Sequence, residues 1–244
     1  MRRILWGQEY LRTRGKGDRV DVEAVHRACA ETGADTFCMV IFENYKNSRE
    51  ECAAVAEELR KRKIETWIDL ARPNETELDE GFLLRIKDSA IKAVCLDDWN
   101  GGNWTNDSTK ALVDVIGCCM LVLPVVYPHT IGRIWETSIS GVVFPYLWPH
   151  GDHRTISSLL PELEAAKDSL MELGSGQVLV GMGYDQQTTV AFKRKESRST
   201  NKHLEACLRG IKQACDYGTA SDVAVWQPNV RDEKRTTAIR KGWE

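Results

Sequence analysis

Two adjacent acids, Asp97 and Asp98, directly follow the apolar run at residues 93–96. A carboxylate at the end of a buried segment is costly unless it is hydrogen-bonded, and a second carboxylate beside it raises one of the two pKa values. A carboxyl group with a raised pKa can act as a general acid near neutral pH. We therefore interpret both residues as candidate catalytic groups; the alternative is an Asp that caps the next loop or pairs with Arg72 or Arg133.

A second catalytic carboxylate is expected at the end of another apolar run. Asp185 is the first choice, because it follows such a run and has Tyr184 and Gln186 beside it, and Glu43 is the second. Other polar and aromatic residues that end apolar runs are candidates for substrate binding. Together with the two that flank Asp185, the candidate substrate-binding residues are Glu9, Asp69, Trp99, Tyr127, Tyr146, Trp148, Tyr184, Gln186, Trp226 and Gln227.

The elements that must position these residues are eight apolar runs. They cover residues 4–6, 36–42, 64–70, 91–96, 118–127, 141–147, 177–182 and 222–226. Most are continuous rather than alternating, which is typical of parallel strands that are covered on both faces. Amphipathic segments between them predict helices, among them 20–32, 48–63, 157–173 and 201–217.

Eight strand–helix units in 244 residues predict an α/β fold, a single (β/α)8 TIM barrel that spans residues 1–244. The alternative is an open doubly wound sheet, which would favour a Gly-rich phosphate loop after the first strand; the sequence there, GQEYLRTRGKG, does not have that pattern. In a barrel, catalytic groups lie at the carboxyl ends of the strands. The candidate residues would then share one rim, whose aromatic rings and hydrogen-bonding groups suit sugars.

These motifs resemble a TIM-barrel glycoside hydrolase, distantly of the chitinase-like or α-galactosidase-like clans. The resemblance depends on the LDDW segment that contains Asp97 and Asp98, on the tyrosines after later strands and on Trp226. It implies hydrolysis of an oligo- or polysaccharide through two carboxylates. The chitinase pattern DxxDxDxE is absent, and so are the glutamates of the largest retaining clan, so no single family is assigned.

Two other functions stay open. A non-catalytic carbohydrate-binding barrel would keep the aromatic rim and use the acids only as hydrogen-bond acceptors. A metal-dependent hydrolase or deacetylase could use His129, His150, Asp152 and His153, although HxxH in a loop has weak specificity. We expect no bound metal and no cofactor.

Composition limits the partners and the compartment. The net charge is −3, which gives no electrostatic signature of nucleic-acid or membrane binding. The eight cysteines match no CxxC pattern and lie mostly in apolar runs, so we expect buried free thiols in a cytoplasmic protein. The start MRRILWGQE lacks the apolar segment of a signal peptide, although a signal removed earlier would leave the same start.

Overall fold

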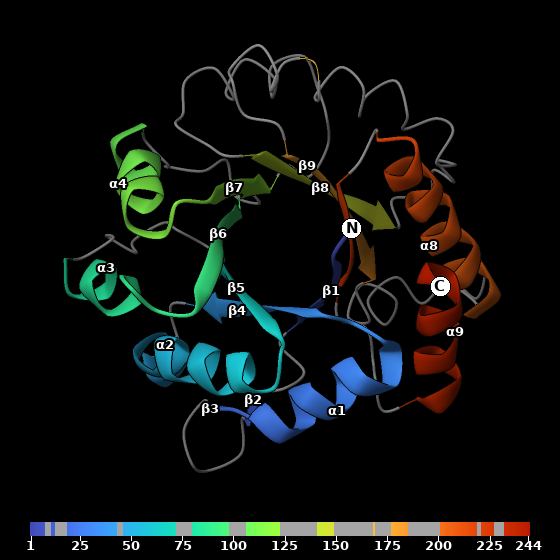
Figure 1. Ribbon diagram of the computed structural model, residues 1–244, viewed down its shortest axis with the longest axis horizontal. Coiled ribbons are helices and arrows are strands. Elements are labelled where there is room, and N and C mark those ends of the chain that lie inside the picture. Colours follow the sequence, from blue (N-terminus) through green and yellow to red (C-terminus); the bar gives the residue numbers. More distant parts are fainter. Residues whose placement is uncertain are drawn as a thin grey trace.

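The computed structural model of the protein is an α/β fold built on a curled parallel sheet (Figure 1). It describes residues 1–7, 11–12, 19–42, 46–71, 80–97, 106–122, 141–148, 168, 177–184, 201–218, 221–226 and 232–244. The parallel strands are β1 (Arg3–Gly7), β4 (Thr36–Phe42), β5 (Glu65–Ala71), β6 (Ile91–Asp97), β7 (Cys119–Val122), β8 (Gly141–Trp148), β9 (Gln177–Tyr184) and β10 (Asp222–Trp226). They pair in the order β1-β10-β9-β8-β7-β6-β5-β4, and β1 also pairs with β4, so the sheet closes on itself.

Helices lie outside this sheet, between consecutive strands (Figure 1). They are α1 (Val22–Thr32), α2 (Lys46–Lys61), α3 (Glu80–Ile86), α4 (Asn106–Ile116), α8 (Asn201–Asp216) and α9 (Glu233–Trp243). The predicted α/β fold with a parallel sheet is therefore confirmed. The helix expected over 157–173 lies outside the described residues, apart from residue 168.

Helix α1 shows why these segments fold as they do. Asp21 precedes it, and its Oδ1 accepts a hydrogen bond from the amide of Ala24, the usual interaction of an N-cap residue. The helix ends at Gly33, whose φ of 76° is a left-handed conformation that glycine adopts without steric cost.

A two-stranded antiparallel ribbon follows β1 and was not predicted. It pairs β2 (Leu11–Arg12) with β3 (Arg19–Val20). Strands of two residues are too short to give a periodic hydrophobic pattern, so the sequence carries no signal for them.

Each strand of the parallel sheet has two different faces, because successive side chains point to opposite sides. On the outer face, apolar side chains such as Leu5 and Val94 pack against the helices in one large core cluster. On the inner face, a smaller cluster fills the barrel. Its members are Ile4, Trp6, Cys38, Val40, Trp67, Ala93, Cys95, Met120 and Ala224.

Candidate functional site

On the inner face of the barrel, the carboxylate of Asp69 is buried among apolar and sulfur-containing side chains. Asp69 on β5 has no solvent exposure and lies in register with Val40 on β4 and with Cys95 on β6. Cys95 is in turn in register with Met120 on β7. Asp69 therefore belongs to a row of inner residues that crosses four neighbouring strands.

Trp6 forms a hydrogen bond with the carboxylate of Asp69. Its indole Nε1 donates a hydrogen bond of 2.9 Å to Oδ2 of Asp69, and Trp6 is itself buried on β1. A buried charge is stable only when hydrogen bonds or opposite charges compensate for the lost hydration. The indole both provides such a bond and fixes the direction of the carboxylate, which can then accept hydrogen bonds from N–H groups of a ligand.

Two cysteines next to Asp69 are neutral thiols at neutral pH. Burial raises the pKa of Cys38 to about 11, a hydrogen bond from Cys95 opposes that rise, and the negative charge of Asp69 adds to it. Burial is also the main reason that the pKa of Cys95 lies well above its ordinary value. Because the thiolate is the nucleophile, these side chains are unsuited to nucleophilic catalysis.

The described cysteines are free thiols, as predicted. Five of them are buried and two, Cys118 and Cys215, are half-buried. Within the residues described, no group of three or more His, Cys, Asp or Glu side chains is arranged to hold a metal ion. In the same part of the chain, no helix is both long and apolar enough to cross a membrane.

Five predicted site residues lie at or near the carboxyl ends of neighbouring strands. Asp97 is the last residue of β6, and Trp226 is the last residue of β10. Tyr184 ends β9 in register with Trp148, which ends β8, and Tyr146 lies two residues earlier in β8. The backbone therefore brings these five residues to one rim, as the sequence predicts.

Asp69, also a predicted site residue, lies inside the barrel, and the remaining predicted site residues lie outside the described part of the chain. These are Glu9, Glu43, Asp98, Trp99, Tyr127, Asp185, Gln186 and Gln227. The residues of the metal-site alternative, His129, His150, Asp152 and His153, lie outside it too.

The amino end of the barrel has its own polar network. The guanidinium of Arg2 lies 5.1 Å from the ring centroid of Trp67 and 3.7 Å from carboxylate oxygens of both Glu65 and Asp222. The indole of Trp67 donates a 2.7 Å hydrogen bond to Glu65. Because each of these charged groups has an opposite charge beside it, we interpret this network as structural. It covers the amino end of the barrel, opposite to the rim.

Sequence reasoning missed Trp6 as a site residue. Trp6 lies two residues after Ile4 on the same strand, and this alternation was the available signal that both face the interior. The partnership with Asp69 joins residues 63 positions apart and leaves no local pattern.

Solved structures similar to this chain include dihydropteroate synthases. The enzyme of Coxiella burnetii, solved in complex with pteroic acid, matches with a TM-score of 0.54 and 13% sequence identity over 98% of this chain and 91% of its own. The enzyme of Burkholderia cenocepacia matches with a TM-score of 0.53 and 15% identity over 99% of this chain and 90% of its own. No family model and no curated protein matches the chain.

The comparison corrects the expected function. The resemblance to glycoside hydrolases is wrong, because the similar structures are synthases of dihydropteroate. The expected hydrolase and glycosidase activity and the expected carbohydrate substrate are therefore wrong as well. The two alternatives, a non-catalytic carbohydrate-binding barrel and a metal-dependent hydrolase, are not supported either. The physical reason is that acids and aromatic rings at strand ends suit any flat, hydrogen-bonding ligand, and their spacing does not identify a sugar.

Proposed function

We propose that the chain is an enzyme that binds a pterin-type heterocycle at the carboxyl end of its barrel. The observation that carries this proposal is the Asp69 carboxylate, which is buried beside the apolar inner cluster of the described strands and oriented by Trp6. Buried carboxylates of this kind are costly, so their presence favours a binding role. The ligand class comes from the fold likeness to an enzyme solved with pteroic acid.

The chemistry of a pterin ring fits this part of the molecule. Its pyrimidine edge carries an amino group beside a ring N–H, and two such donors can form parallel hydrogen bonds with one carboxylate. Asp97 ends β6 and lies two positions beyond Cys95, the residue in register with Asp69. We propose that Asp97 binds the pterin ring at the rim and that Asp69 lies deeper in the same site. The aromatic residues that end β8, β9 and β10 would stack on the ring.

The acids that follow other strands complete the proposal. Asp98, Glu43 and Asp185 come directly after β6, β4 and β9 in the sequence. We propose them as the acid–base groups of the reaction. We also propose that the chain forms a complete (β/α)8 barrel as a single domain over residues 1–244, because helices alternate with strands wherever the chain between two strands of the barrel is described.

Titration of the full chain with pteroic acid tests the proposal. The chain has eight tryptophans, so quenching of their fluorescence reports binding near the barrel. We expect saturable binding, and we expect Asp97→Asn and Asp69→Asn each to weaken it by about tenfold or more, the effect of losing a hydrogen bond to a charged group.

Asp222→Asn is the matched control, because Asp222 is also a buried strand carboxylate but lies at the opposite end of the barrel. It should leave the Kd for pteroic acid unchanged. The proposal fails if pteroic acid shows no saturable binding, or if all three variants bind it as the wild type does.

A further inference from the structure

An open groove lies between helices α8 and α9, outside the barrel interior. The two helices run side by side on the outside of the barrel (Figure 1). The groove has a volume of about 390 Å³, which is in the range of small-molecule sites. It is lined by Asn201, Lys202 and Glu205 from the first two turns of α8, and by Glu233, Lys234, Thr237, Ala238 and Lys241 from α9.

One end of the groove is closed by close packing. Beyond Lys241, the next residue, Gly242, lies against Leu208 so tightly that a Cβ at that position would be 2.6 Å from the Cβ of Leu208. The two helices are in direct contact there, so the groove does not continue between them beyond Lys241.

The charges of the groove favour an anion. Lys202, Lys234 and Lys241 are exposed, and none of them forms an ion pair with another residue of the described chain. Of the two glutamates, Glu205 is already paired with Arg209 on its own helix. Three unpaired ammonium groups thus face one unpaired carboxylate, Glu233, in a chain whose net charge is −3.

The lysines on α9 are placed to act together. Lys234, Thr237, Ala238 and Lys241 follow the helical spacing of three and four residues, so they share one face of α9. Lys202 approaches the same groove from α8. A ligand with several negative charges can contact ammonium groups from both helices at once, while Thr237 and Asn201 offer neutral hydrogen-bond donors.

We propose that this groove binds a phosphate-bearing small molecule. Phosphate groups carry more than one negative charge and several acceptor oxygens, which matches three lysines better than a single carboxylate would. The site uses none of the residues of the pterin-type site, so each can exist without the other.

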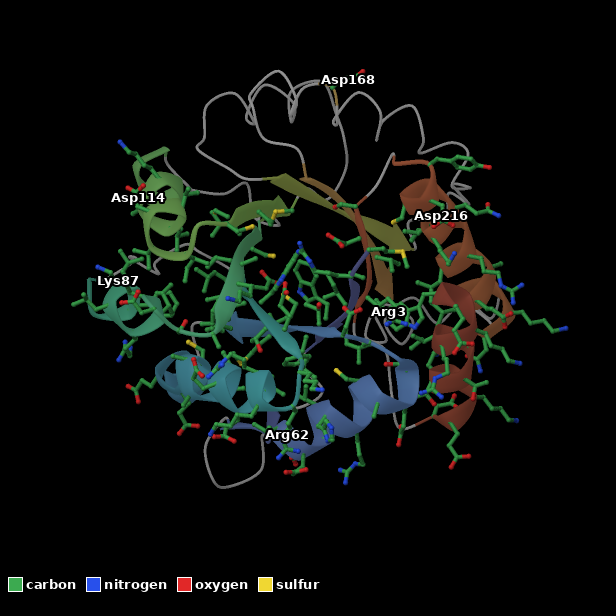
Figure 2. The ribbon with its side chains drawn as sticks, viewed as in Figure 1. Arg3, Arg62, Lys87, Asp114, Asp168 and Asp216 are labelled. Carbon is green, nitrogen blue, oxygen red and sulfur yellow. The ribbon has the colours of Figure 1, made fainter. Side chains whose placement is uncertain are left out.

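Calorimetric titration of the full chain with inorganic pyrophosphate at low ionic strength tests the proposal. We expect saturable binding that weakens as salt is added. The double variant Lys234→Ala/Lys241→Ala should raise the Kd at least tenfold. Lys87→Ala is the matched control, because Lys87 is an exposed lysine that follows α3, on the far side of the barrel from α8 (Figure 2), and it should bind as the wild type does.

A variant with the opposite expected effect guards against a general loss of structure. Glu233→Gln removes the unpaired carboxylate of the groove and should lower the Kd severalfold. The proposal is overturned if pyrophosphate gives no saturable signal, or if the double variant and Glu233→Gln both keep the wild-type Kd. Binding of pteroic acid by the double variant should be unchanged, which separates this proposal from the proposed function.

Discussion

The two faces of the barrel strands have different compositions and different roles in the protein. The outer face and the helices over it share one large cluster of mostly aliphatic side chains, including Leu5, Ile68 and Leu96. Among the described residues, the inner face has two tryptophans, two cysteines and a methionine near Asp69. We conclude that the outer layer supplies most of the stability, while the inner face gives up some stability to hold a charged group.

Removing Trp243 should be the most damaging change in the outer layer. Trp243 is 2% exposed, and its indole donates a 2.7 Å hydrogen bond to the carbonyl of Thr32, which links α9 to the end of α1. Trp243→Ala should lower the free energy of unfolding by about 3 to 5 kcal/mol, measured by urea denaturation. Tyr217→Ala is the control: Tyr217 is 85% exposed, so a comparable loss there would contradict this assignment.

Removing the indole donor of the inner face should have the next largest effect. Trp6→Phe keeps an aromatic ring but deletes the hydrogen bond to Asp69, at a cost of about 1.5 to 3 kcal/mol. A double-mutant cycle with Asp69→Ala, which removes the acceptor, isolates the pair. If the two single losses simply add, the hydrogen bond contributes nothing to stability, and the inner face differs less from the outer face.

The pKa of Cys38 predicts a pH effect from the inner face. A thiol in the unfolded chain ionises near pH 8.5, but burial raises the pKa of Cys38 in the fold to about 11. Above pH 8.5 the unfolded state therefore loses a proton that the folded state keeps, so stability falls as pH rises. The expected loss from Cys38 is about 1 to 2 kcal/mol at about pH 9.5 and close to zero at neutral pH.

Urea denaturation at the two pH values, with Cys38→Ala beside the wild type, measures this contribution. The alanine variant should lose less stability on going to high pH than the wild type does. An equal loss in both proteins would show that the thiol ionises in the fold as it does in the unfolded chain.

The cap of α1 should have the smallest effect. Asp21→Ala removes the acceptor for the Ala24 amide and should cost about 1 kcal/mol in the same denaturation assay. Asp21→Asn keeps an acceptor oxygen and should retain most of the stability. A cost for Asp21→Ala as large as that for Trp243→Ala would mean that α1 depends on its cap rather than on packing.

The sequence predicted the strands well because parallel strands covered on both faces read as continuous apolar runs. Residues 36–42 and 222–226 coincide with β4 and β10. The strand ends then followed, and with them the placement of Asp97 and of Trp226 at one rim.

The ligand and the inner hydrogen bond could not be predicted in the same way. Aromatic and acidic residues at strand ends can bind both sugars and heterocycles. The presence of Trp148 or Asp97 therefore does not show which of these two ligand classes binds. The bond between Trp6 and Asp69 depends on how two distant strands are brought together, and the local sequence of neither strand encodes it.

The pairing of β1 with β10 has a consequence for how the protein is made. Residues 3–6 pair with residues 223–226, so one edge of β1 has no partner until more than two hundred further residues have been synthesised. An open strand edge is a template for pairing with other chains. Contacts between such distant positions also slow folding. The nascent chain therefore spends most of its synthesis exposed to aggregation, and we expect its yield in cells to depend on translation rate and on chaperones that shield β1.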